Sequence, residues 1–563
     1  MLTFTRLNRN IRSIRRYRTI LGILIKYGFG HVVEQLNINY YLELGRRLVT
    51  FGRAPVEIDR LTPPERLRLA MEELGPTFIK LGQLLSTRPD VIPKEYADEF
   101  RKLQDAVPSI PFAEISVQIE RELKHPAEDF FAELAELPIA AASIAQVHRG
   151  RLKSGEEVVV KVRRPGIERT VETDIDILFG LAYLIERHFP AGEIYDAVGI
   201  VREFQRTIER EMDFGREGHT IDRFAANFSG DATVHIPRVF WQCTGERVLT
   251  MEYVAGVKVS DFARLREVGC DLQLIARRGA DAFLKQVLVH GLFHGDPHPG
   301  NIFILPGNVI CMLDYGMVGR LGEDLKFQLA DLLVAVMQRD VDAVISQLLY
   351  SGELMDEVNL RGLRRDLTVF IEDYYEVSLR EIKVGRLLSE FVEILIRYRI
   401  KFPADLMLLA KALVTMEGLG RQLDPDFNMI DHLRPFLDQV VRERLTPGAV
   451  AREMGRVVQG YGALLKNLPR DLKELLNRIN RNKFKIDLEH RGLEKLITDL
   501  DKASNRLSFS LLIAALIVGS SIVMQTDKGP LLLGFPILGF LGYSIAGLLG
   551  LWLAIAILRS GRL

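Results

Sequence analysis

Two short motifs near the middle of the chain constrain its fold more than any other feature of the sequence. HGDPHPGN occupies residues 294–301, and LDYG follows at residues 313–316. An Asp followed five positions later by an Asn is typical of a catalytic loop, in which the Asp orients or deprotonates a nucleophile and the Asn holds a magnesium ion. The second motif ends a short apolar segment that reads as a buried strand carrying a carboxylate. Asp296, Asn301 and Asp314 therefore have the order and spacing that phosphoryl transfer by a kinase-like fold requires.

Upstream, residues 140–162 resemble a nucleotide-binding hairpin. The sequence AAASIAQVHRGRLKSGEEVVVKV predicts a strand, a loop, a strand, a turn and a third strand that carries Lys161, in position for the phosphates. The phosphate loop, usually rich in glycine, is here rich in alanine, which resists positive φ angles. Lys161 alone is more simply an edge-strand surface lysine, but the catalytic loop downstream favours a functional role. The predicted nucleotide-binding residues of the loop are Ala140, Ala141, Ala142, Ser143, Ile144, Ala145 and Gln146.

The strand lysine of a kinase needs a carboxylate partner on a helix. Residues 163–230 are predicted to be helical and offer Glu211, Asp213 and Glu217, any of which could serve; a solvated acidic face is the alternative. Residues 236–256 then predict two strands that run into an interlobe hinge, whose backbone would hydrogen-bond an adenine edge. The predicted hinge residues are Met251, Glu252, Tyr253 and Val254.

A second unusual string lies in the apolar helical pattern of residues 75–100. Lys80, Gly82 and Gln83 form a K-x-G-Q motif, and placing these residue types in a half-buried helix costs stability. We therefore expect partners for them. A snorkelling lysine beside a packing glycine is the simpler alternative.

The segment after LDYG is too short to seat a peptide in the manner of a protein kinase. Only GMVGRLGE separates Gly316 from a helix predicted to begin near Asp324, and no A-P-E motif follows. Gly295 also stands where an Arg would read a phosphorylated activation segment. Switching by phosphorylation of that segment is therefore not expected.

The two ends of the chain suggest a membrane. Residues 1–30 interleave Arg with apolar residues and contain no acid, which predicts a helix on an anionic membrane surface; a mitochondrial presequence and a solvated basic helix are the alternatives. Leu507–Met524 is an uncharged apolar run of 18 residues and Leu531–Leu558 one of 28, each long enough to span a bilayer. Basic residues outside both runs predict cytoplasmic ends, and a buried soluble hairpin is the alternative.

Length and composition set the remaining limits. The 563 residues are too many for one core, and the formal net charge of zero gives nucleic-acid binding no support. Three scattered cysteines, Cys243, Cys270 and Cys311, are expected to be reduced, buried thiols. The predicted segments are a basic membrane-proximal helical region (1–60), a K-x-G-Q helical extension (61–135), a kinase-like N-lobe with a helical insertion (136–256), a helical C-lobe (257–440), a basic helical linker (441–506) and a transmembrane hairpin (507–558).

Six motifs in order resemble the UbiB-type (ADCK) atypical kinase-like family. They are KLGQ at 80–83, AAASIAQVH at 140–148, VVVKV at 158–162, EMDFGREG at 211–218, FHGDPHPGN at 293–301 and LDYG at 313–316. The resemblance covers residues 61–428, and the paired apolar runs resemble bacterial members. It implies an α+β, two-lobed atypical protein-kinase-like fold with a helical N-terminal extension and two C-terminal transmembrane helices. Ala145 and Tyr315 stand where many members have Gly and Phe, and both changes are mild.

The resemblance also implies roles for single residues. Lys161 would contact the phosphates of ATP and pair with Glu217, Asp296 would be the catalytic-loop Asp, and Asn301 and Asp314 would bind Mg²⁺.

Lys80 would reach across the site toward Glu211, with Gln83 and Asp213 close by. In such a family the K-x-G-Q helix occupies the space that a peptide would need, in agreement with the missing activation segment.

The expected function is that of a membrane-anchored ATPase or phosphotransferase that supports ubiquinone biosynthesis. A bacterial inner membrane with the catalytic body in the cytoplasm is favoured over a mitochondrial membrane. Expected partners are a membrane lipid or quinone precursor, other quinone-biosynthesis proteins and a second copy of the chain. Two alternatives stay open. One is a small-molecule kinase of the aminoglycoside or choline kinase type, because the loop also fits H-G-D-x-H-x-x-N; the other is an ATP-gated scaffold that transfers no phosphate.

Overall fold

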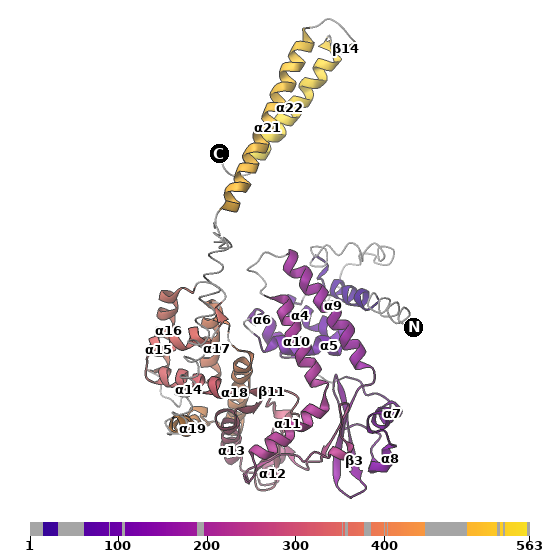
Figure 1. Ribbon diagram of the computed structural model, residues 1–563, viewed down its shortest axis with the longest axis vertical. Helices are drawn as coiled ribbons and strands as arrows, with labels where there is room; N and C mark the ends of the chain where they lie inside the picture. Colours follow the sequence, from indigo (N-terminus) through magenta and orange to yellow (C-terminus); the bar gives the residue numbers. More distant parts are fainter. Residues whose placement is uncertain are drawn as a thin grey trace, which may run out of the picture. The chain divides into compact units, whose positions relative to one another are not determined.

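A computed structural model describes the chain in two compact units, residues 1–451 and 452–563, and each is considered by itself (Figure 1). The described residues are 15–31, 61–88, 91–103, 107–188, 196–351, 353–354, 358–375, 384–398, 400–401, 403–444, 493–525, 530–532 and 535–559. Most of the predicted basic region 1–60 and of the predicted linker 441–506 therefore lies outside the described residues.

The N-lobe is built on a five-stranded antiparallel sheet of order β1-β3-β4-β6, with β2 beside β3. Its strands are β1 (Phe131–Leu134), β2 (Ala140–Ala141), β3 (Ala145–Leu152), β4 (Glu157–Arg163) and β6 (Val248–Glu252). Successive residues of a strand point to opposite faces. Val158, Val160 and Val162 of β4 are fully buried in a core shared with α7 (Phe112–Leu123), next to α8 (Ala127–Phe130). Lys161 therefore emerges on the opposite face.

The predicted strand arrangement of residues 140–162 is confirmed, but two details near it differ. β1 was not predicted, because four residues are too short for an alternating pattern to be recognised. Of the two strands predicted in residues 236–256, the first is wrong. Val239 forms only a single bridge with Met251, and residues Trp241–Cys243 form the 3₁₀ turn η2.

The helical extension and the helical insertion between β4 and β6 share one apolar core. They contribute α4 (Pro63–Leu74), α5 (Pro76–Ser86), α6 (Lys94–Phe100), α9 (Ile167–His188) and α10 (Ala197–Glu211). Phe78 and Ile79 of α5 are buried there with Ile175 of α9 and Phe204 of α10. Figure 1 shows these helices together, beside the sheet. The K-x-G-Q helix is thus held on two sides.

Residues 15–26 form the predicted basic helix, and its apolar side packs on protein. Ile20 and Leu21 are buried, and Leu21 packs against apolar residues of α9. Arg16 Nε lies 2.6 Å from Oδ1 of the fully buried Asp174 in α9. Part of the apolar side of this helix thus packs on α9, and the association of residues 1–30 with a membrane surface stays a prediction.

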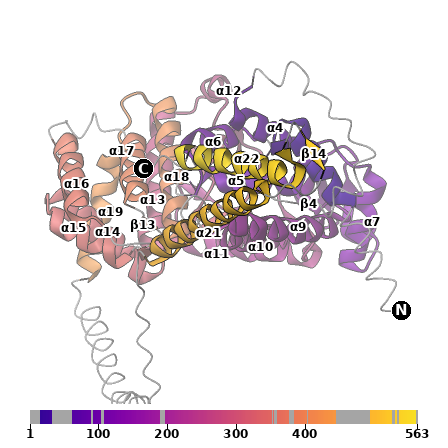
Figure 2. The same cartoon turned by 90° about the horizontal axis from the view of Figure 1, so that it is seen from above.

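The C-lobe is mainly helical, and Figure 2 shows α14 to α19 grouped at one end of the first unit. Its helices are α12 (Phe262–Glu267), α13 (Leu272–Leu284), the π-helical turn η3 (Lys285–His290), α14 (Glu323–Met337), α15 (Val341–Ser351), α16 (Leu360–Tyr375), α17 (Val384–Arg397), α18 (Ala404–Leu423) and α19 (Met429–Arg444). The helix α11 (Phe214–Asn227) precedes them in the chain and packs against β6 of the N-lobe sheet. A sheet of order β5-β10-β9-β7 and two further strand pairs complete it. These strands are β5 (Val234–His235), β7 (Val257–Lys258), β8 (Leu292–His294), β9 (Ile302–Leu305), β10 (Val309–Met312), β11 (Val318–Arg320), β12 (Glu353–Leu354) and β13 (Ile400–Lys401).

The predicted shortness of the segment after LDYG is confirmed. Residues 318–320 form β11, which pairs with β8, and α14 begins at Glu323. No room is left for a peptide-seating segment between them.

The second unit contains two long apolar helices, α21 (Leu493–Met524) and α22 (Ile537–Arg559). By length and composition, Ser504–Met524 and Ile537–Ala554 are able to cross a membrane, and only 6% and 11% of their most apolar windows are buried. Such exposure is not typical of a soluble buried hairpin. The second apolar run is helical only from Ile537, because β14 (Leu531–Leu532) and β15 (Phe535–Pro536) form a small hairpin before it.

Small residues bring the two apolar helices together. A Cβ on Gly542 would lie 2.1 Å from Ser520 Oγ, and one on Gly539 would lie 2.7 Å from Met524 Cγ.

Candidate active site

The catalytic loop is held by a buried histidine. His294, at the end of β8, is 1% exposed. Its Nδ1 accepts the N–H of Asp296 at 3.1 Å, and its Nε2 lies 3.1 Å from the carbonyl oxygen of Leu313. Burial lowers the pKa of His294, which favours the neutral ring that this donor–acceptor pattern needs. One imidazole thus ties the loop that carries Asp296 to the strand that leads to Asp314.

A β-hairpin brings the two predicted metal ligands together. Ile302 of β9 pairs with Met312 of β10, and the Leu313 N–H donates to the Asn301 carbonyl oxygen at 2.8 Å. Asn301 therefore lies beside Asp314. Asp314 has a φ of 62°, a left-handed conformation that Asp tolerates better than most residues.

Lys161 bridges two acids at the centre of the site. Its Nζ lies 3.0 and 2.9 Å from the two carboxylate oxygens of Glu217 and 3.1 Å from Oδ1 of Asp314. Of the three candidate acids, Glu217 is thus the partner of the strand lysine, as the family resemblance implied. Its side chain is only 4% exposed, whereas that of Asp314 is 54% exposed and open to a ligand.

The electrostatics favour a charged site. The ammonium group of Lys161 holds the pKa of Asp314 well below its usual range, and Lys80 adds to this effect. Burial opposes the charge on Lys161, but the carboxylates of Asp314 and Glu217 outweigh it and raise its pKa. Burial raises the pKa of Glu217 despite the nearby Lys161. Asp314 therefore stays ionised and ready for a cation.

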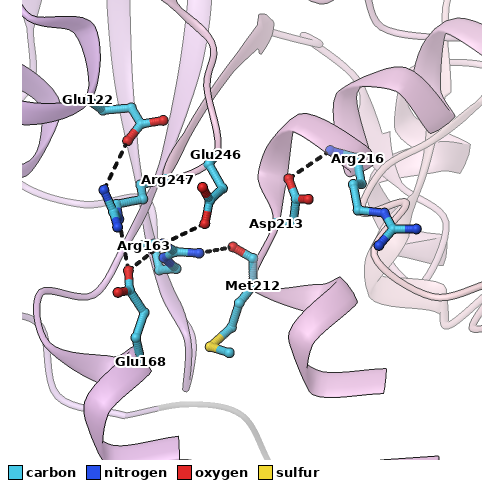
Figure 3. Close-up of polar contacts among 8 residues, drawn as sticks. All are labelled: Glu122, Arg163, Glu168, Met212, Asp213, Arg216, Glu246 and Arg247. Carbon is cyan, nitrogen blue, oxygen red and sulfur yellow. Dashed lines mark hydrogen bonds and ion pairs between the residues drawn. The ribbon is translucent and has the colours of Figure 1, made fainter. Parts of the chain in front are cut away.

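A buried guanidinium positions the helix that carries Glu217. Arg163, two residues after Lys161 on β4, is 2% exposed and bonds the carbonyl oxygen of Met212 and the carboxylate of Glu168 (Figure 3). The same Glu168 accepts from Arg247 at 2.8 Å, and Arg247 lies 3.6 Å from Glu122.

Asp213, which follows Met212 in the chain, caps the N-terminus of α11 (Figure 3). Its side chain accepts the N–H of Arg216 at 3.1 Å. This cap ends α10 and starts α11 between Glu211 and Glu217, so the two glutamates lie on different helices and take different lysines.

Lys80 of the K-x-G-Q helix pairs with Glu211, as predicted, with side chains 15% and 25% exposed. Glu211 in turn lies at the LDYG turn, because a Cβ on Gly316 would be 3.8 Å from its Cγ. Gln83 donates to the Leu103 carbonyl oxygen at 3.4 Å. Gly82 is required by packing, since a Cβ there would lie 2.3 Å from Leu103 Cδ1. The helix therefore closes one side of the site.

The alanine-rich loop is a tight hairpin anchored in the helical extension. The Ala142 N–H donates to the Ala145 carbonyl oxygen at 2.8 Å, and no residue of the loop has a positive φ, so alanine is acceptable there. Ile144 is buried in the core that contains α5, and Ser143 is fully buried. The Gln146 side chain bonds both backbone polar groups of Ile110, at 2.8 and 3.2 Å. The Gln146 side chain is therefore occupied, and its backbone lies in β3 between β2 and β4.

Part of the predicted hinge belongs to the N-lobe sheet and is already hydrogen-bonded within the protein. Met251 and Glu252 belong to β6, and the N–H of Glu252 donates to Arg238 at 2.9 Å. The N–H of Tyr253 donates to Glu157 at 3.0 Å. Val254 follows β6, and among the described residues its N–H has no hydrogen-bond acceptor. This amide is the one best suited to an adenine edge.

Sequence reasoning missed one face of α18, which lies on the catalytic loop. Asp405 Oδ1 accepts the N–H of Arg320 at 3.2 Å. Leu408 packs on Gly295, where a Cβ would lie 2.7 Å from its Cδ2.

The third residue of this face is Lys411, whose Nζ lies 3.1 Å from Oδ1 of Asp296. Spacing of three residues places all three side chains on one side of the helix. Nothing in the local sequence links α18 to a loop so far away in the chain.

The residues present fit magnesium bound together with a nucleotide. No group of three or more His, Cys, Asp or Glu side chains able to hold a metal occurs among the residues that the structure describes. Mg²⁺ commonly uses one or two protein oxygens together with substrate phosphates. Asn301 and the ionised Asp314 supply two hard oxygen ligands of this kind.

The fold and the site define a kinase-like protein: a lysine on the N-lobe sheet, a carboxylate on a helix, a catalytic loop and a metal-binding turn come together. The chain matches the ABC1 atypical kinase-like domain over residues 102–348, the UbiB helical domain over 367–428 and the ABC1/UbiB kinase-like C-terminal domain over 491–559. This chain belongs to the UbiB family of atypical kinase-like proteins.

The chain is also similar to several individual proteins. The chain is 35% identical over 481 residues to the probable protein kinase UbiB of Pseudomonas fluorescens, covering 84% of this chain and 89% of that protein. It is 34% identical over 554 residues to an uncharacterized protein of Clostridium pasteurianum from the hydrogenase 1 5′ region, covering 98% of this chain and all of that one. The solved structure of Mycobacterium tuberculosis Rv3197 with erythromycin is 21% identical, has a TM-score of 0.44, and covers 61% of this chain and 87% of that one.

Proposed function

We propose that this protein is a membrane-anchored, magnesium-dependent ATPase or phosphotransferase that supports ubiquinone biosynthesis. The single observation that carries the proposal is the placement of Lys161 between Glu217 and Asp314, 3.1 Å from the latter, with Asn301 at the same turn. Lys161 would hold the phosphates of ATP, and Asn301 and Asp314 would hold Mg²⁺, which supplies charge neutralisation when bound.

A non-protein acceptor is favoured over a peptide. The K-x-G-Q helix closes the site through Lys80 and Glu211, and α14 begins soon after the LDYG turn. Asp296 would orient water or an acceptor hydroxyl and accept its proton. A quinone precursor or a membrane lipid is the acceptor class that this chain is proposed to serve, with other quinone-biosynthesis proteins and a second copy of the chain as further proposed partners.

The two helices Ser504–Met524 and Ile537–Ala554 support membrane anchoring. Arg506 precedes the first and Arg559 ends the second, so the positive-inside rule favours cytoplasmic ends. We therefore propose the inner membrane of a bacterium, with the kinase-like body in the cytoplasm.

The proposal is tested by Asp314→Asn in the full-length, detergent-purified protein. Magnesium-dependent ATP turnover should fall to background while the thermal unfolding midpoint stays near that of the wild type. Asp342→Asn is the matched control, because it removes an exposed carboxylate whose ion-pair partner among the described residues is Arg364 on the surface. Equal turnover in Asp314→Asn and the control would sink the assignment.

Terminally labelled ATP then identifies the reaction. Label in a phenolic or lipid acceptor supports a phosphotransferase, and free phosphate alone supports an ATPase. Label in an aminoglycoside- or choline-like metabolite would instead favour a small-molecule kinase. Binding of ATP without any phosphate release would favour a scaffold.

A further inference from the structure

The catalytic loop contains no cation of its own. HGDPHPGN has neither Lys nor Arg. Both ring nitrogens of His294 are occupied by backbone groups, and Nδ1 of His298 accepts the N–H of Gly300 at 3.1 Å, so neither ring is available as a cation in this arrangement. A phosphoryl-transfer site nevertheless needs positive charge close to the reacting oxygens.

The other lysines of the site are already committed. Lys161 pairs with Glu217 and Asp314, and Lys80 pairs with Glu211. Among the residues that the structure describes, the cation that pairs with the Asp296 carboxylate is Lys411, at 3.1 Å.

The geometry of α18 makes this contact specific. The helix is fixed on the loop one turn earlier by Leu408, which packs on Gly295, and two turns earlier by Asp405, which accepts from the backbone of β11. Lys411 is the next residue on the same face, so its position relative to Asp296 does not depend on its own ion pair. The two side chains are 30% and 40% exposed. An ion pair this exposed adds little to the free energy of unfolding, so stability does not account for the contact.

We propose that Lys411 is a positioning residue for phosphoryl transfer, acting through Asp296; this inference rests on the proposed function. Its ammonium group holds the carboxylate of Asp296 in place until that carboxylate receives a proton. The oxygen of the acceptor hydroxyl or water forms a bond to the terminal phosphorus of ATP. The bond from that phosphorus to the bridging oxygen breaks, and its electron pair leaves with ADP. The proton of the acceptor goes to the carboxylate of Asp296.

The test compares Lys411→Ala, Lys411→Arg and Lys285→Ala in the full-length protein in detergent. Lys285 is the matched control because it forms a similar half-exposed ion pair, 2.9 Å from Asp231, outside the site. We expect Lys411→Ala to lower kcat about 100-fold, with the KM for ATP changed by less than about three-fold. Lys411→Arg should recover kcat to within about ten-fold of the wild type, since it restores a cation with a different shape. Lys285→Ala should behave as the wild type does.

A double variant separates positioning from a structural role. If Lys411 acts through Asp296, Asp296→Asn with Lys411→Ala should be no slower than Asp296→Asn alone, because the two residues work as one unit. Independent, multiplicative losses would overturn the inference, as would normal kcat in Lys411→Ala or a loss shared by Lys285→Ala. If the wild type is active and any of these results is found, the inference about Lys411 fails while the proposed function stands. Absence of phosphate release from the wild type overturns the proposed function and the inference with it.

Discussion

Gly295→Ala tests whether α18 dictates the glycine of the catalytic loop. Gly295 is not among the glycines with positive φ, so its backbone accepts alanine without strain. The obstacle is Leu408: an added Cβ would lie 2.7 Å from its Cδ2, 3.0 Å from Cγ and 3.1 Å from Cδ1. Carbon atoms in contact prefer about 3.5–4.0 Å. The added Cβ would clash with three atoms of the Leu408 side chain at once. Removing the clash therefore requires a shift of about 1 Å by the loop or by α18.

The expected cost follows from two opposing effects. Overpacking a site of this kind costs about 1–3 kcal/mol. Alanine also restricts the unfolded chain, which returns about 0.4–1 kcal/mol. The net loss of unfolding free energy is then about 1–2 kcal/mol, or roughly 2 °C in the unfolding midpoint for a body of this size. Activity should suffer more, because a displacement of about 1 Å near the chemistry can cost on the order of 100-fold in rate.

The assay is a double-mutant cycle of Gly295→Ala and Leu408→Ala, measured by thermal unfolding and by ATP turnover of the full-length protein. Leu408→Ala makes room for the new methyl group, so the double variant should regain at least about ten-fold in rate over Gly295→Ala. Gly418→Ala on the same helix is the control. It meets no atom within 4 Å and should be neutral or stabilising. A fully active and stable Gly295→Ala protein would refute the explanation.

Three further predictions concern the rest of the site and the core. Arg163→Met should lower the unfolding free energy by about 3 kcal/mol, because it leaves the carbonyl of Met212 without its donor and removes one of the two cations that pair with Glu168. Arg151→Met, which breaks an exposed pair with Glu133, should change the unfolding free energy by less than about 1 kcal/mol in the same chemical denaturation. MgATP at 100 times its Kd should add about 2.7 kcal/mol to the free energy of unfolding. Mg²⁺ alone should add almost none, because the protein by itself offers too few ligands. Equal shifts of the thermal unfolding midpoint with MgATP and with Mg²⁺ alone would contradict this. Burial raises the pKa of Cys243 to about 11 and that of Cys311 to about 12, so at pH 8 iodoacetamide should alkylate only the partly exposed Cys270 in the native protein and all three thiols in denaturant, as counted by mass spectrometry.

The sequence alone determined the chemistry-bearing parts and their local setting. A strand with a lysine, a loop with Asp and Asn, and a carboxylate after a short apolar strand are each recognisable because periodicity and turn residues are local properties. The same reasoning found the short segment after LDYG, and β11 followed directly by α14 confirms it. It also found the two apolar C-terminal runs, although the first residues of the second run form the small hairpin of β14 and β15 and not part of α22.

Residue chemistry alone left the pairing of charges open, and the tertiary structure decided it. Glu211, Asp213 and Glu217 were equivalent candidates for Lys161 until the cap at Asp213 placed the two glutamates on different helices. An amphipathic pattern cannot say what covers its apolar side, and only the structure shows that Leu21 of the helix at residues 15–26 packs on α9. The contact of Lys411 with Asp296 joins segments far apart in the chain, so only the packing of α18 on the loop reveals it. Local sequence thus specifies which groups are present, while packing decides which of them meet.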